Sequence, residues 1–174
     1  MSSGGIGAAI GRIIRDVLQS LVRSTNKAPR RTTRTPPKVS SRYPGDYRGT
    51  PAMTYDPHPG KIADPGEVVW TWVPFEEDFT QGKDRPVLVV GRDGDWLLVL
   101  MLTSKDHDRD AAQEARAGRH WIDVGTGSWD PQRRPSEIRV DRVIRINPDE
   151  VRRVTDKFPR DKFDTVAAAV RRYT

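Results

Sequence analysis

The sequence contains no cysteine, which excludes both a disulfide framework and a zinc site built from thiolates. Histidine is scarce too. The three histidines, His58, His107 and His120, lack the close spacing of a metal-ligand set. The sequence therefore predicts no bound metal, and no motif in it indicates a cofactor.

Long apolar runs are also missing. No run approaches the roughly 18–20 residues that a membrane-spanning helix needs. The apolar residues near the N-terminus are separated by Arg12, Arg15 and Asp16, whereas a secretory signal packs them into one block. The cytoplasm is therefore the expected location.

The net charge of +6 is unevenly distributed along the chain. Residues 1–60 contain ten Lys and Arg against three Asp, whereas residues 61–174 contain twenty basic against twenty-one acidic residues. A basic N-terminal arm attracts polyanions such as RNA, DNA or an anionic membrane surface without sequence preference. A solvated tail that keeps the protein soluble would have the same composition, so the charge alone does not decide between a polyanion-binding arm and such a tail.

Residues 1–25 are expected to contain an amphipathic helix, because apolar residues recur there at helical spacing. These residues are Ile6, Ile10, Ile13, Ile14, Val17, Leu18, Leu21 and Val22. The helix could pack on the domain or on a partner, lie on a membrane surface as a peripheral contact, or remain poorly ordered. The absence of Trp and Phe from its apolar face weakens the membrane alternative.

Residues 26–61 are rich in proline and arginine and contain few apolar side chains. Such a segment buries too little surface to offset the entropy lost on ordering. The composition predicts a disordered linker of extended character.

The folded domain is expected over residues 62–174, with five strands. The β-branched, aromatic and alternating segments that predict them are 66–73, 86–90, 96–102, 119–124 and 137–146, the last as one longer or bent strand. An Asp-Gly pair at 93–94 predicts a hairpin between the second and third strands. Residues 75–84 are polar and predict a loop.

Two helices are expected at the C-terminal end. Asn147 and Pro148 suit the cap and first position of a short helix that Pro159 would end. Residues from Asp161 to about Tyr173 carry Phe163 and other apolar residues on one face, as an amphipathic helix does.

Four motifs occur in order within this domain. They are Gly-Glu-Val-Val-Trp at 66–70, Gln-Gly-Lys-Asp-Arg-Pro at 81–86 followed by Val-Leu-Val-Val, Thr-Ser at 103–104, and Arg-Val-Asp-Arg-Val-Ile-Arg at 139–145. Together they resemble the MazF/PemK toxins, a family of metal-independent endoribonucleases, over about residues 62–172. The resemblance implies a mainly β domain with C-terminal helices, built as an SH3-like partly closed barrel. It also implies a homodimer that cleaves single-stranded RNA, with an antitoxin protein as a possible partner.

Cleavage of RNA without a metal uses the adjacent 2′-hydroxyl as nucleophile. The reaction needs a base, help for the leaving oxygen, and fixed positive charge at the phosphorane. Guanidinium suits the last role because it stays charged and offers a planar fork to phosphate oxygens. The resemblance places Arg85, Thr103 and Asp141 in catalytic roles, Asp141 as the base or as the group that orients an arginine. The expected RNA contacts are Gln81, Lys83, Ser104, Arg139 and Arg142, with Trp121 and Trp129 as candidates for base stacking.

The sequence departs from the family pattern at Thr80, where some relatives have a glutamate that is a candidate base. The base is then Asp84, Asp141 or an acid of the segment 76–78. A second hypothesis follows: the domain has lost its base and is a weak or inactive RNA- or protein-binding module tethered by its N-terminal arm.

Overall fold

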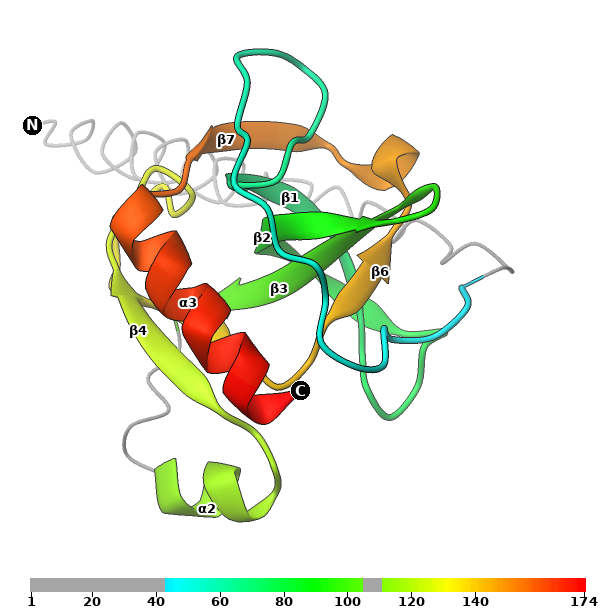
Figure 1. Cartoon of the computed structure of the whole chain (residues 1–174), viewed down its shortest axis with the longest axis vertical. Coiled ribbons are helices and arrows are strands. Elements are labelled where there is room, and N and C mark those ends of the chain that lie inside the picture. Colours follow the sequence, from blue (N-terminus) through cyan, green and yellow to red (C-terminus); the bar gives the residue numbers. More distant parts are fainter. Residues whose placement is uncertain (1–42, 105–110) are drawn as a thin grey trace, which may run out of the picture. The chain divides into compact units, whose positions relative to one another are not determined.

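The computed structural model describes residues 43–104 and 111–174 (Figure 1). The amphipathic helix expected over residues 1–25 lies outside this range. Within the described part of the chain, no helix is both long and apolar enough to cross a membrane.

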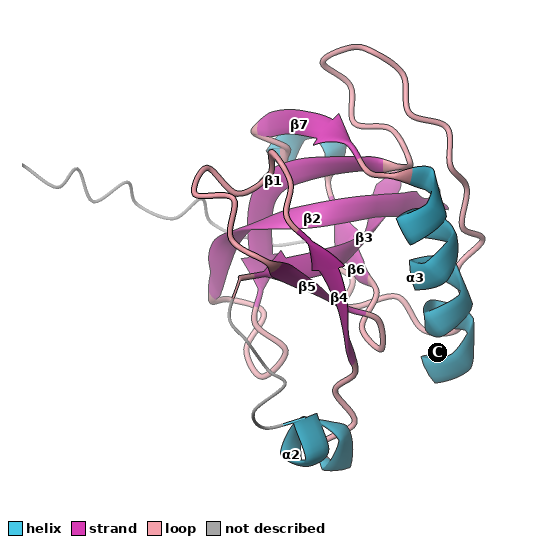
Figure 2. Cartoon of the chain, turned by 90° about the vertical axis from the view of Figure 1, so that its left-hand side faces the viewer, coloured by secondary structure: helices cyan, strands magenta, loops and turns pink. Residues whose placement is uncertain are grey.

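The domain is built on one antiparallel sheet of seven strands, which Figure 2 shows with α3 packed to one side. The spatial order is β4-β5-β3-β2-β1-β7, and β6 also pairs with β3. The strands are β1 (Glu67–Pro74), β2 (Gly82–Asp93), β3 (Trp96–Thr103), β4 (Trp121–Gly125), β5 (Ser136–Arg139), β6 (Ile144–Ile146) and β7 (Arg153–Lys157). Among the described residues β4 and β7 do not pair with each other, so the sheet is not closed. The expected mainly β domain with a C-terminal helix is confirmed.

The centre of the sheet is the antiparallel meander β1-β2-β3. Thr71 of β1 pairs with Arg85 of β2, and the expected hairpin turns at Gly94 with a positive φ of 59°. A bulge interrupts the β2–β3 ladder between Val89 and Gly91. A Cβ atom at Gly91 would lie 2.6 Å from the carbonyl oxygen of Ala52, so this glycine lets an upstream segment approach the strand closely.

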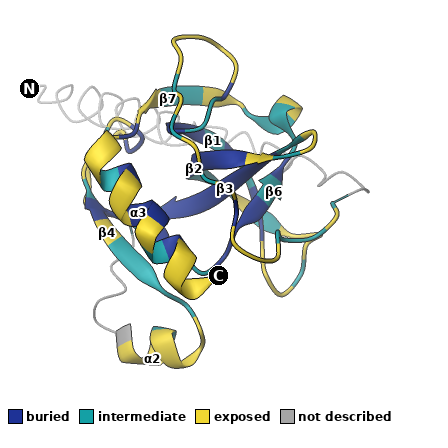
Figure 3. Ribbon diagram, viewed as in Figure 1, coloured by how far each residue is buried: buried dark blue, intermediate teal, exposed yellow. Residues whose placement is uncertain are grey.

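Apolar side chains pack on both faces of the sheet, because β2 and β3 are buried on both sides. Leu88 and Val90 belong to one cluster, which the helix α3 (Arg160–Tyr173) covers with its buried side chains Phe163, Val166, Ala167 and Val170 (Figure 3). Val87 and Val89, which alternate with them, belong to the second cluster. The candidate site lies at the second face.

The segment 137–146, expected as one longer or bent strand, forms two strands. β5 pairs with the end of β3 at Leu102 and Thr103, and β6 pairs with its beginning. The backbone between β5 and β6 forms hydrogen bonds with other segments. The amide of Val140 donates to the carbonyl of His120, and the carbonyl of Val143 accepts from the amide of Tyr47. These long-range bonds replace the ladder that a continuous strand would make.

The segment after Asn147 differs from the expected helix. Asn147 does cap the turn, its side chain accepting from the amide of Asp149, but the turn is only the 3₁₀ helix η2 (Pro148–Glu150). Residues 153–157 then extend as β7 along β1. An unpaired edge of β1 offers this segment more hydrogen bonds than an isolated short helix would. The six-residue helix α2 (Ala111–Arg116) was not expected.

Residues 43–61, which composition assigns to the disordered linker, lie along the domain in the structure. Tyr47, Met53 and Tyr55 pack against the first cluster, and the Tyr55 hydroxyl donates to the carbonyl of Phe158 at 2.7 Å. The amide of Thr54 donates to Val90. A few side chains between the prolines anchor this segment, and the overall composition of the segment gave no sign of them.

Phe158 is fully buried and touches the ring of Trp129 at 5.6 Å between centroids. We expect Phe158→Ala to lower the free energy of unfolding by about 3–5 kcal/mol, because it leaves a cavity between α3 and the sheet. Ile62→Ala, at a side chain 72% exposed, should change it by less than about 0.5 kcal/mol. Urea denaturation of both variants measures the difference, and equal values would contradict this packing.

Candidate functional site

A cavity of about 350 Å³ opens at the second face of the sheet. Its apolar wall includes Val73, Met101 and Trp121. Its charged lining comes from β2, β5, the helix α2 and the neighbouring loops, and consists of Glu76, Glu77, Arg85, Glu114, Arg119, Arg139 and Arg142. Four guanidinium groups thus border one cavity, and the partner of each decides what it can do.

Arg85 is half-buried and makes no ion pair or hydrogen bond with any residue that the structure describes. Burial lowers the pKa of its guanidinium, and the positive charge of Arg142 lowers it further. Both effects mean that the charge of Arg85 lacks solvation and a counter-charge. An anion entering the cavity would supply what is missing.

Arg85 and Thr103 also border a second cavity, of about 310 Å³. Trp70, Lys83 and Ser104 lie on its wall. A chain with one phosphate at the shared residues would extend one neighbouring nucleotide into each cavity. The structure thus brings together Arg85, Thr103, Ser104 and Lys83 of the residues expected from the sequence.

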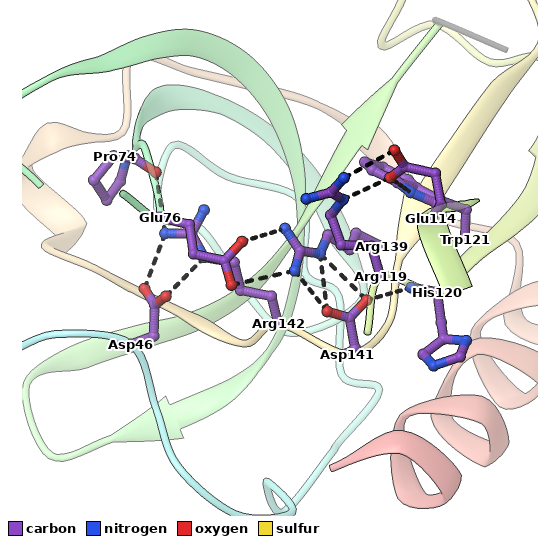
Figure 4. A network of polar contacts seen from close by, with 10 residues as sticks. All are labelled: Asp46, Pro74, Glu76, Glu114, Arg119, His120, Trp121, Arg139, Asp141 and Arg142. Carbon is purple, nitrogen blue, oxygen red and sulfur yellow. Dashed lines mark hydrogen bonds and ion pairs between the residues drawn. The ribbon is translucent and has the colours of Figure 1, made fainter. Parts of the chain in front are cut away.

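Arg139 is buried and held between two carboxylates (Figure 4). Its Nε and Nη2 donate to Asp141 at 3.0 and 2.7 Å, and its Nη1 donates to Glu76 at 2.8 Å. Burial acts to lower the pKa of Arg139, but its bonds to Asp141 and Glu76 outweigh burial and raise it. Arg139 is therefore a fixed cation with its charge balanced.

Asp141 accepts from the backbone amide of His120 at 2.6 Å as well as from Arg139. Its side chain is only 8% exposed. With its oxygens engaged in this way, the carboxylate orients the arginine and has little freedom to take a proton from a substrate. Of the two roles expected for Asp141, the geometry favours the orienting one.

Arg142 is a second balanced cation. Its Nε donates to Asp46 at 2.7 Å, and its Nη2 donates to Asp46 at 3.2 Å and to the carbonyl of Pro74 at 3.1 Å. The motif 139–145 identified Arg142 but not its partner, because Asp46 lies 96 positions upstream.

Arg119 was not identified from the sequence. Its guanidinium donates to both carboxylate oxygens of Glu114, which also accepts from the indole of Trp121 at 3.1 Å. This group adds the expected stacking candidate Trp121 to the cavity wall. The available signal was the opposite charges of Glu114 and Arg119 beside an aromatic strand residue.

Three expected residues are outside both cavities, buried, or engaged by another residue. Gln81 donates to Asp78 at 2.8 Å and borders neither cavity. Trp129 is 2% exposed and its indole donates to Ser136, so the expectation that it stacks on a base is wrong. Asp84, a candidate base, forms an ion pair with Arg152.

The remaining candidate bases lie on the loop 75–81. Glu76 is bound to Arg139, and Asp78 accepts from Thr80 and Gln81. Glu77 borders the first cavity and has no polar partner among the described residues. No group of three or more His, Asp or Glu residues in the described ranges is arranged to hold a metal ion.

The hydrogen bond from Arg139 holds the pKa of Glu76 below its ordinary value. A carboxyl with a lowered folded-state pKa stabilises the fold above its unfolded pKa, and this stabilisation is lost as the pH falls through the lowered value. We expect Glu76→Gln to cost roughly 0.2–1 kcal/mol at pH 7, because the side chain is half-exposed and screened.

The cost of Glu76→Gln should shrink as the pH falls from about 5 and vanish below the lowered pKa. Urea denaturation at a series of pH values measures it. Glu77→Gln, on the same loop, should show no comparable pH dependence, and a constant cost for Glu76→Gln would contradict the ion pair.

Comparison with known proteins agrees with the four motifs. A family model described as "PemK-like, MazF-like toxin of type II toxin-antitoxin system" matches residues 64–174, well over half of the chain. Among curated proteins, no match to the chain was found. The resemblance inferred from the motifs is confirmed, and the chain belongs to the family of PemK-like and MazF-like toxins of type II toxin–antitoxin systems.

Proposed function

We propose that the protein is a metal-independent endoribonuclease that cleaves single-stranded RNA, and that it is the toxin of a toxin–antitoxin pair. The observation that carries this proposal is the guanidinium of Arg85, which is half-buried, uncompensated among the described residues and shared by two adjacent cavities. Phosphate fits the planar fork of a guanidinium, and the two cavities that Arg85 borders give a nucleic-acid chain room on either side of it.

In the proposed reaction, the 2′-oxygen attacks the adjacent phosphorus and the bond from phosphorus to the 5′-oxygen breaks. The products are a 2′,3′-cyclic phosphate and a 5′-hydroxyl. Arg85 binds the non-bridging oxygens, whose negative charge grows in the phosphorane. A preorganised charge of this kind is worth about 10²–10³ in rate.

Thr103 borders both cavities beside Arg85, so its hydroxyl is the proposed second contact to the reacting phosphate. Ser104 and Lys83 border the second cavity, where they would contact the neighbouring nucleotide. Gln81 would contact RNA only beyond the cavities, since it borders neither. The leaving 5′-oxygen takes its proton from water while these donors stabilise its charge.

Glu77 is the proposed base for the 2′-hydroxyl. It is the acid of the first cavity that has no polar partner among the described residues, whereas the lowered pKa of Glu76 makes that carboxylate a weaker base. Asp141 positions Arg139, which holds the loop 75–81 through Glu76. In this scheme Arg85 acts on the reacting phosphate, and Arg139 and Arg142 line the cavity beside it.

We also propose, from the membership of the toxin family, that the protein forms a homodimer and is bound by an antitoxin. Phe75 and Phe79 of the loop 75–81 are 38% and 37% exposed. Large apolar side chains beside a cationic cavity suit an acidic, amphipathic peptide that covers the groove between this loop and Thr103. The proposed location is the cytoplasm, where messenger RNA is available.

Arg85→Ala should reduce cleavage of a long single-stranded RNA by at least about 10²-fold, because the phosphorane loses its counter-charge. The assay is run in EDTA with the product ends mapped, and discrete cuts with 5′-hydroxyl ends are expected from the intact protein. Arg171→Ala, an exposed charge on α3, is the matched control and should cleave normally.

RNA that is bound but never cut by the folded protein would refute the nuclease. That outcome would favour the alternative, an inactive RNA- or protein-binding module. Cleavage that survives Arg85→Ala would leave the nuclease standing and remove Arg85 from its centre.

Glu77→Gln should lower kcat by about 10²–10⁴-fold with little change in KM, since it removes a proton acceptor and keeps the shape. Asp95→Asn, an exposed acid in the β2–β3 turn, is the control for the lost negative charge. Single-turnover cleavage of a defined oligoribonucleotide measures the rate of each variant. A rate for Glu77→Gln equal to that of Asp95→Asn would assign the base elsewhere.

A further inference from the structure

Arg142 lies at the wall of the first cavity, close enough to Arg85 for its charge to lower the pKa of that residue. Its Nε and Nη2 are occupied by Asp46 and Pro74, as Figure 4 shows, while Nη1 takes part in none of these contacts. The donors Nε and Nη2 of Arg142 are thus engaged, next to Arg85, which has no counter-charge among the described residues.

The carboxylate of Asp46 meets this fork with both oxygens, Oδ2 at Nε and Oδ1 at Nη2. Two phosphate oxygens would use the same pair of donors in the same way, because an arginine fork accepts carboxylate and phosphate with similar geometry. Asp46 does not itself line the cavity, but it occupies the fork of Arg142, which does, and so holds a position that suits a phosphate.

Asp46 belongs to a strap, residues 43–47, that precedes the region matched by the toxin family at 64–174. The strap is held by packing of Tyr43 and Tyr47 on the two apolar clusters and by hydrogen bonds of its backbone. The amide of Tyr47 donates to Val143, and the Nη1 of Arg145 donates to the carbonyls of Gly45 and Asp46.

Two further contacts of the strap involve Tyr43. Its hydroxyl donates to Asp46 at 2.5 Å, and its ring meets that of Phe79 edge to face at 5.1 Å between centroids. The same strap thus fills the fork of Arg142 and touches the loop 75–81 that walls the cavity. No other acid of the described chain is bonded to Arg142.

We propose that Arg142 is a second phosphate-binding subsite for RNA, next to Arg85, and that Asp46 of the strap occupies it as an internal competitor. The proposal deepens the function proposed above and rests on it for the identity of the ligand. With Asp46 in place, Arg85 is the one uncompensated guanidinium of the cavity among the described residues. Release of the strap adds a second, adjacent phosphate contact.

The test measures binding of a 2′-O-methyl single-stranded oligoribonucleotide, which lacks the nucleophile and stays uncut, to the full chain in EDTA over a range of salt concentrations. Asp46→Asn keeps the shape of the strap and removes its charge, and Asp46→Ala empties the fork. We expect tighter binding by both, with the slope of log K against log salt steeper by about 0.7, the contribution of one added phosphate contact on a single strand.

Two controls separate this subsite from a general change of charge. Asp164→Asn removes the acid from another pair, Arg160 with Asp164 at 3.2 Å, whose members border neither of the two cavities and are not bonded to the strap. It should leave the slope unchanged. The double variant Asp46→Asn/Arg142→Gln should lose the gain, because the added contact requires Arg142. Thermal unfolding confirms that each variant is folded.

An unchanged slope in both folded Asp46 variants would overturn the proposal. So would an equal gain in Asp164→Asn, a gain that survives in the double variant, or no binding of the oligonucleotide by any variant. Cleavage of unmodified RNA by the intact protein is measured beside it. A steeper slope in the Asp46 variants without cleavage by the intact protein would refute the nuclease and support the subsite. Cleavage by the intact protein with an unchanged slope in the Asp46 variants would support the nuclease and refute the subsite.

Discussion

The site depends on the neutralisation of one buried cation, Arg139. A guanidinium taken out of water is tolerated only with a counter-charge and hydrogen bonds, and here two carboxylates supply both. Asp141 lies two residues away on the same segment, but Glu76 comes from the loop after β1. The pairing therefore fixes the loop 75–81 against β5, and with it the acids and aromatic residues that wall the cavity.

The same rule distinguishes the four arginines around the cavity. Arg119 and Arg142 each meet a carboxylate with two donors, as Arg139 does, whereas Arg85 meets none among the described residues. Its position explains the difference, because β2 places it opposite Thr71, where neighbouring strands offer hydroxyl and apolar groups. Charge balance elsewhere thus directs an anion toward Arg85, and the lowered pKa records the solvation that the residue lacks.

Local sequence patterns predicted the strands of the meander, the Asp-Gly turn and the amphipathic α3, because each depends on neighbours within a few residues. They failed for β7, whose extended form depends on a free edge of β1 about eighty residues away. The motifs identified Arg85, Thr103 and Arg139 but did not predict which residues contact them or which cavity they line. Asp46 and Glu114 were missed because an acid in a polar segment carries no local sign of the arginine that it meets.

The loop around Thr80, where the sequence departs from the family pattern, is fixed by hydrogen bonds at both ends. Thr80 donates to Asp78, which also accepts from Gln81, so this short segment is ordered by its own hydrogen bonds. Arg139 holds the other end through Glu76. Glu77 lies between these two fixed points and is bonded to neither, so the backbone is fixed on both sides of a residue that borders the cavity. A constrained loop with one acid unpaired among the described residues is consistent with the proposal that Glu77 is the general base.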